Sequence, residues 1–142
     1  MIKQQGFSLI EALISLVILS LGLVGVAAMQ LKALQSATIG YQHSVVTLAA
    51  VDAQERLWAE LPGEVNCNEI NPKKENGVED QWRMLWSRDE PSNPLRNMNW
   101  QDSDIQGPDI NCEFTITIGL SGGYGGIEAD DFTYSFRLPK LL

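Results

Sequence analysis

A run of 23 residues, from Phe7 to Met29, contains one ionisable side chain, Glu11. As an α-helix that rises about 1.5 Å per residue, this run would be roughly 34 Å long, enough to cross the apolar core of a bilayer. An acid at mid-bilayer costs about 2.5–3.5 kcal/mol, and intramembrane acids usually have a partner or a function. The run therefore predicts a membrane helix in which Glu11 does more than anchor the chain.

Two ordinary uses of such a run remain open at this point. A secretory signal would be cleaved after the small residues Val-Ala-Ala at 26–28, but its apolar stretch is shorter and needs no acid. A plain membrane anchor is the second alternative. In either case Lys3 and the amino terminus keep the first residues cytoplasmic and place everything after Met29 outside. Neither alternative explains Glu11.

The sequence G-F-S-L-I-E at residues 6–11 follows a short polar leader and precedes the apolar helix. This arrangement closely resembles the processing signature of type IV pilins and the related pseudopilins. The resemblance implies that a membrane aspartyl peptidase, the prepilin peptidase, cuts between Gly6 and Phe7 on the cytoplasmic side. It also implies that the peptidase N-methylates Phe7 and that the helix is retained in the mature protein.

Cleavage after Gly6 would expose an amine at Phe7, one helical turn from Glu11. A carboxylate at that depth can pair with the amine of a neighbouring subunit where apolar helices pack together. The unpaired charge is costly in lipid, and pairing in the assembly relieves that cost in one register. The resemblance gives Glu11 this role in recruitment and register during filament assembly.

The charges are unevenly distributed along the chain. Of the 18 acids, Glu11 alone precedes residue 51, and the net charge is −8. An acidic chain has little attraction for phosphate backbones or anionic headgroups, which argues against direct binding of nucleic acid.

Cys67 and Cys112 are the two cysteines, and both follow the apolar run. An even number of cysteines after an export-like N-terminus predicts a disulfide formed in an oxidising compartment. Two buried free thiols are the alternative. Neither cysteine belongs to a C-x-x-C motif, so zinc binding and redox catalysis have little support.

The pattern after Gln30 predicts that one helix continues from about Ser8 to about Glu60 and ends at the Leu-Pro-Gly of residues 61–63. Apolar residues near helical spacing are expected to form a stripe that packs on a sheet. They are Leu34, Ala37, Tyr41, Val45, Leu48, Val51, Trp58 and Leu61.

Residues 62–111 show little periodicity, with a short strand or helix expected around 81–87. Alternating apolar and polar residues predict strands at 113–120 and 131–138, joined as an antiparallel hairpin by the glycine-rich segment 121–130. The expected fold is α+β, a type IV pilin fold in which a long N-terminal helix, with a protruding apolar half and an amphipathic half, packs on an antiparallel sheet of three or four strands.

The chain is accordingly divided into four parts, all of them expectations. They are a removed cytoplasmic leader (1–6), a transmembrane and filament-core helix (7–29), the amphipathic half of the helix (30–61) and an acidic periplasmic globular part with an αβ-loop and a C-terminal β-hairpin (62–142).

Residues 102–113 have an acidic spacing that partly fits an EF-hand calcium loop, with Asp102, Asp104 and Glu113 at its first, third and twelfth places. Gln106 is a poor ligand, and no helix is expected to follow, so a solvated acidic loop is the favoured interpretation. His43, the single histidine, has no ligand or nucleophile at a useful spacing. We therefore predict no catalytic residue, no metal and no cofactor.

Within the family, the chain looks most like a minor pilin of the PilV type. That likeness implies a structural subunit of the inner membrane of a Gram-negative bacterium, which primes type IV pilus assembly and lies in the tip complex. Its partners would be other minor pilins, the major pilin, the prepilin peptidase and the inner-membrane assembly platform. A minor pseudopilin of a type II secretion system and a signal-anchored periplasmic enzyme are the alternatives.

Overall fold

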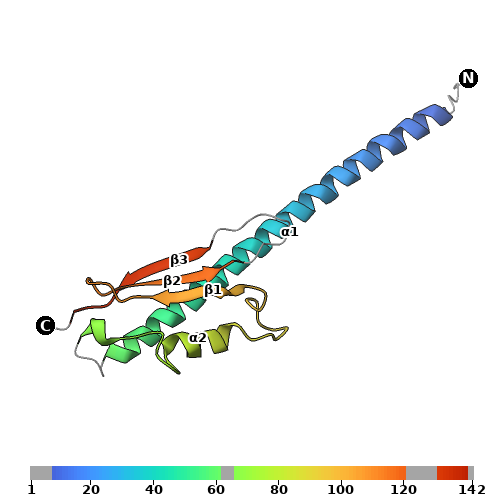
Figure 1. Ribbon diagram of the computed structural model, residues 1–142. Helices are drawn as coiled ribbons and strands as arrows, with labels where there is room; N and C mark the ends of the chain where they lie inside the picture. Colours follow the sequence, from blue (N-terminus) through green and yellow to red (C-terminus); the bar gives the residue numbers. More distant parts are fainter. Residues whose placement is uncertain (1–7, 62–65, 121–130, 141–142) are drawn as a thin grey trace, which may run out of the picture. The chain divides into compact units, whose positions relative to one another are not determined.

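The computed structural model describes residues 8–61, 66–120 and 131–140. The predicted processing residues, the Pro-Gly after the long helix and the glycine-rich connection lie outside these ranges. The chain forms two compact units, residues 1–38 and 39–142. The elements are α1 (Leu9–Glu60), the 3₁₀ turn η2 (Cys67–Glu69), α2 (Val78–Trp86), β1 (Asn99–Gln106), β2 (Glu113–Gly119) and β3 (Phe132–Arg137) (Figure 1).

The three strands form one antiparallel sheet in the order β1-β2-β3. The predicted hairpin is confirmed, since β2 and β3 pair without interruption from Glu113↔Arg137 to Ile118↔Phe132. The third strand, β1, was not located from the sequence. Its residues, NWQDSDIQ, are mostly polar and do not alternate, so that period-2 hydrophobicity cannot reveal it.

The inner face of β2 supplies the centre of the core. Phe114, Ile116 and Ile118 alternate along the strand and are completely buried. Burying each such side chain contributes about 1.5–3 kcal/mol. They share one cluster with residues of α1, α2 and the long segment before β1, among them Leu57, Trp82 and Leu95. The domain is thus an α+β layer of helix on sheet, as predicted.

The face of α1 that packs on the sheet differs from the predicted stripe. The buried residues of the helix are Val45, Val46, Ala49, Ala50, Ala53 and Leu57. Of the predicted stripe Val45 and Leu61 are buried, whereas Tyr41, Leu48 and Trp58 are exposed by 59%, 61% and 41%. The stripe is wrong because the buried face of α1 is centred on the small residues Ala49, Ala50 and Ala53, which a pattern weighted toward large residues overlooks.

A bulge interrupts β1, and a buried hydroxyl forms hydrogen bonds with backbone groups of both strands there. The register of β1 against β2 shifts between Asn99 and Asp104. Within this interval Ser103, completely buried, donates its hydroxyl to the Asn99 carbonyl and accepts from the Gly119 N–H, both at 2.9 Å. A side chain at Gly119 would lie 2.6 Å from the Asn99 carbonyl oxygen, so the close approach requires glycine.

Helix α2, in the position where a short strand or helix was expected, packs its tryptophan between α1 and β1. Trp82 is completely buried, and its indole N–H donates to the Ala49 carbonyl of α1 at 2.8 Å. Its ring meets Trp100 edge-to-face, with centroids 5.4 Å apart. The buried N–H is therefore satisfied, as a buried tryptophan requires.

Two charged side chains of α2 close the outer edge of β1. Glu79 accepts the Ile105 N–H at 3.2 Å, and Arg83 donates to the carbonyls of Trp100 and Ser103. Glu79 and Arg83 also pair with each other at 2.9 Å. Backbone groups of an edge strand that would otherwise be free are thus occupied by side chains of the same domain.

A disulfide joins Cys67 in η2 to Cys112, immediately before β2, with the Cα atoms 5.7 Å apart. Both cysteines are buried. The bond links the segment after α1 to the start of the hairpin across 45 residues of sequence. Closing a loop of this length restricts the unfolded chain, which is the main source of disulfide stabilisation in the chain-entropy model.

Replacing both cysteines, as Cys67→Ala with Cys112→Ala, is expected to lower the free energy of unfolding by about 2–4 kcal/mol. The measurement is urea unfolding of the full chain in detergent, followed by tryptophan fluorescence. The control is the wild-type chain unfolded with and without reductant, which should show the same difference. An unchanged unfolding midpoint in the variant would show that the bond contributes no stability.

Candidate processing and assembly segment

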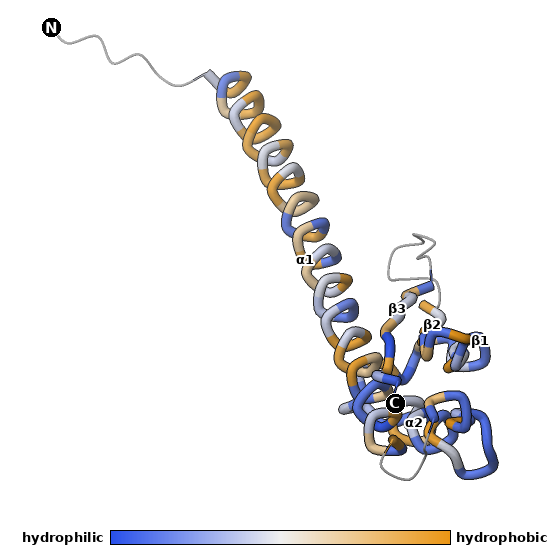
Figure 2. Tube along the Cα trace, turned by 90° about the vertical axis from the view of Figure 1, so that its left-hand side faces the viewer, coloured by the Kyte–Doolittle hydropathy of each residue, from blue (hydrophilic) through white to orange (hydrophobic). Residues whose placement is uncertain are grey.

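The described part of the first unit is helical and lacks any buried residue. Residues 9–34 of α1 are all exposed, including Leu9, Ile18 and Val24 at 79%, 65% and 67%. By length and composition, α1 could cross a membrane, with a mean hydropathy of 2.5 over 18 residues of which none is buried. Figure 2 shows the apolar residues distributed all around this part of the helix, as expected where lipid or other helices surround it.

Glu11 lies in the first turn of α1. The Ser8 carbonyl accepts the N–H groups of Glu11 and Ala12 at 3.0 and 3.2 Å, which starts the helix there. The Glu11 residue is exposed, and no ion pair within residues 8–61, 66–120 and 131–140 involves its carboxylate. The positive end of the helix dipole favours an acid at this position.

Two serines of the apolar run bond back to helix carbonyls. The Ser15 hydroxyl donates to the Glu11 carbonyl at 2.8 Å, and the Ser20 hydroxyl donates to the Val17 carbonyl at 2.8 Å. These hydroxyls are therefore satisfied within the helix and need no partner in an apolar surrounding. The Glu11 carboxylate is the charged group of the run, and no ion pair among the described residues matches it.

Gly6 and Phe7 lie outside the described residues, so cleavage and methylation between them stay predictions. The comparison with known families concerns this part of the chain. Residues 1–27 match the family model of the prokaryotic N-terminal methylation motif. The chain carries a prepilin-like N-terminus. No curated protein and no solved structure matches the chain.

The prepilin-like N-terminus and the fold support the same family assignment. A long N-terminal helix packed on a small three-stranded antiparallel sheet is consistent with the type IV pilin fold. Together they support a type IV pilin or pseudopilin, a family of structural proteins that are processed by the prepilin peptidase and anchored in the membrane. The disulfide between Cys67 and Cys112 belongs to the globular unit and lies apart from the N-terminal methylation motif in the sequence.

The first part of the acidic segment 102–113, as far as Gln106, is a strand rather than a loop. Asp102 and Asp104 belong to β1, where an extended backbone cannot wrap ligands around one ion. Asp104 is instead paired with Lys73 at 3.1 Å. Both earlier interpretations, an EF-hand loop and a solvated loop, are therefore wrong for this half of the segment. Within the residues that the structure describes, no group of three histidine, cysteine or acidic side chains could hold a metal.

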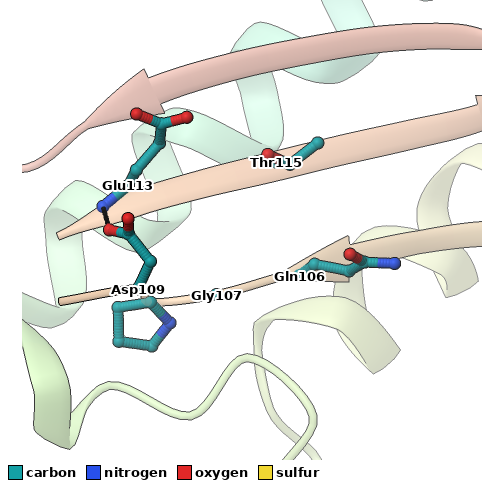
Figure 3. Close-up of a pocket in the computed structure, with 6 residues that line it drawn as sticks. Gln106, Gly107, Asp109, Glu113 and Thr115 are labelled. Carbon is teal, nitrogen blue, oxygen red and sulfur yellow. Dashed lines mark hydrogen bonds between the residues drawn. The ribbon is translucent and has the colours of Figure 1, made fainter. Parts of the chain in front are cut away.

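A pocket of about 210 Å³ lies where β1 turns into β2, lined by Gln106, Gly107, Pro108, Asp109, Glu113 and Thr115. Figure 3 shows the Asp109 carboxylate turned toward the Glu113 N–H, which donates to it at 2.7 Å. This bond, followed by those from Asn111, lowers the pKa of Asp109. The carboxylate is thus engaged in fixing the turn and is not held ready for a ligand.

Two features of the globular unit escaped prediction. One is the closure of the β1 edge by Glu79 and Arg83, whose spacing of four residues was visible but is typical of any solvated helix. The other is the exposed row on α1 that contains Tyr41 and Leu48. His43 is also exposed on α1, at a different angle around the helix.

Proposed function

We propose that the chain is a minor pilin of the PilV type, a structural subunit that primes type IV pilus assembly and lies in the tip complex. The observation that carries this proposal is an acid in the first turn of α1, within an otherwise apolar run and inside the matched N-terminal methylation motif. Glu11 would pair with the amine of Phe7 on a neighbouring subunit. The proposed subunit is structural and has no catalytic activity; it acts through its position in the assembly.

The same proposal fixes the partners and the location. After cleavage between Gly6 and Phe7, the helix stays in the inner membrane with the removed leader on the cytoplasmic side and the globular unit in the periplasm. The partners are other minor pilins, the major pilin, the prepilin peptidase and the inner-membrane assembly platform. An oxidising periplasm suits the disulfide between Cys67 and Cys112.

The mature N-terminus tests the processing. Intact-mass and N-terminal peptide analysis of the protein purified from the membrane should show a first residue Phe7 that carries one extra methyl group. The control is the same chain expressed in cells that lack the prepilin peptidase, where Met1 should remain. A mature chain that begins after Ala28 would instead make the segment a removed secretory signal.

A deletion strain separates the pilus from the secretion system. Loss of surface pili and of twitching motility, with secretion of extracellular enzymes unchanged, is the result expected for a minor pilin. Loss of secretion with intact pili would identify a minor pseudopilin of a type II secretion system, which has the same helix and the same acid. Restoration by the intact gene on a plasmid is the control for both readouts.

A further inference from the structure

The two margins of the sheet are built differently. At the outer margin, β1 contains a register shift and is closed by Glu79 and Arg83 of α2. Strand β3, at the other margin, pairs with β2 over six consecutive residues without a bulge and contains neither proline nor lysine. Proteins usually protect edge strands with bulges, charges, prolines or covering elements. Strand β1 has such protection, whereas β3 has neither a bulge nor a covering element among the described residues, and its one charged side chain, Arg137, is paired with Glu113 of β2 at 2.8 Å.

The backbone of β3 presents a row of free hydrogen-bonding groups. The Leu138 N–H donates to the Cys112 carbonyl at 3.0 Å. Because hydrogen-bonded pairs alternate along an antiparallel ladder, the backbone N–H and carbonyl groups of the even-numbered residues of β3 point toward β2. The N–H and carbonyl groups of Thr133, Ser135 and Arg137 therefore point away from the sheet. These three residues are exposed, and no described residue bonds to those groups.

A row of aromatic side chains accompanies this edge. Phe132, Tyr134 and Phe136 pack against the core but remain partly exposed. The rings of Tyr134 and Phe136 stack with centroids 6.1 Å apart. A strand added beside β3 would satisfy the free backbone groups and cover more of this apolar surface at the same time.

The direction of β3 restricts what such a strand can be. Within the globular unit, β3 runs in the same direction as the final turns of α1, with the Tyr134 hydroxyl donating to Gln54 at 2.6 Å (Figure 1). In two subunits of this fold whose final turns of α1 run in the same direction, the β3 strands also run in the same direction. The strand beside β3 must then run parallel to it, and in this fold β1 is the other edge strand and runs parallel to β3.

We propose that the free edge of β3 pairs with the first strand of a different pilin-like subunit. A second copy does not fit, because its own β1 is closed by Glu79 and Arg83. Antiparallel pairing of β3 with β3 does not fit either, because it would point the two α1 helices in opposite directions. The partner is thus a membrane-anchored relative whose first strand is open, and this identity rests on the proposed function.

The test compares two substitutions of Ser135 in the full chain. Ser135→Pro removes the outward N–H without touching a bond to β2, whereas Ser135→Ala keeps that N–H. Both variants lose the contact between the hydroxyls of Ser135 and Thr115, at 2.9 Å, so that loss cancels in the comparison. A benzophenone amino acid at Thr133, in cells that make pili, reports contact with a partner.

The expected result is a crosslink from Thr133 to the first strand of another protein that carries its own N-terminal methylation motif. Ser135→Pro should reduce the crosslink about tenfold, and Ser135→Ala should leave it within about twofold of the wild type. Near-ultraviolet circular dichroism shows whether the proline variant is folded. If it is not folded, the proposal is tested by the crosslink mapped in the chain that carries benzophenone at Thr133 and no change at Ser135.

Several results would overturn the proposal. They are the absence of a crosslink, a crosslink to residues 121–130 of the same chain, a crosslink to a second copy, and equal losses in the proline and alanine variants. Each of these leaves the proposed function standing if deletion of the gene abolishes pili. If deletion leaves both pili and secretion intact, it is the proposed function that fails.

Discussion

A chain in which Glu11 is replaced by glutamine is expected to accumulate in the inner membrane but to be missing from pili. The variant keeps the length, shape and helix of the apolar run and loses the charge that would pair with the Phe7 amine of a neighbour. Removing one member of a buried ion pair costs about 3–5 kcal/mol, which is about a hundredfold or more in an assembly equilibrium. Immunoblots of sheared pili and of membranes give the ratio directly.

Ser15→Ala is the matched control for this experiment. Ser15 lies one turn after Glu11 in the same exposed apolar run, and its hydroxyl bonds only to the Glu11 carbonyl. The control should enter pili at the wild-type ratio, and N-terminal mass analysis should show normal processing of both variants. Undiminished incorporation of Glu11→Gln would refute the role of the carboxylate.

Trp82→Ala should be the most damaging single substitution in the globular unit. It removes the largest completely buried side chain, which packs edge-to-face on Trp100 and donates to the Ala49 carbonyl. Truncating a buried tryptophan to alanine costs about 3–5 kcal/mol, and the loss of the indole hydrogen bond to the Ala49 carbonyl adds to that cost. Because small domains are only about 5–15 kcal/mol stable, this is a large fraction of the free energy of unfolding. Thermal unfolding of the full chain in detergent measures the loss.

Trp82→Phe separates the two contributions. Phenylalanine retains much of the ring packing but cannot donate to the Ala49 carbonyl, so it should cost roughly 1–3 kcal/mol, clearly less than alanine. Trp58→Ala serves as a surface control, because Trp58 is 41% exposed on α1. Equal stability of Trp82→Ala and Trp58→Ala would mean that the α2 contact with α1 is not part of the folded domain.

The parts of the fold that the sequence predicted are those governed by strict periodicity. An uninterrupted helical pattern between Leu9 and Glu60, and alternation in the β2–β3 hairpin, each correspond to one physical arrangement. The prepilin-like N-terminus could be found for a different reason. A carboxylate in an apolar run is improbable by chance, so Glu11 stands out without any structure.

What could not be predicted depends on contacts between distant residues. Side chains of Ser103, Glu79 and Arg83 form hydrogen bonds with the backbone of β1 where the regular ladder is interrupted or absent. No local sequence pattern predicts such bonds. The orientation of α1 was also beyond the sequence. A helix with large residues on one side and alanines on another can pack by either, and in this domain the side that contains the alanines is buried.

The closure of the β1 edge by α2 has a consequence for copy number. Under the proposed edge pairing, a sheet that can be extended at one margin only accepts a single lateral neighbour, so a row of paired sheets would end at this subunit. One copy per row would then suffice, and the abundance of the protein in the cell would scale with the number of fibres rather than with their length.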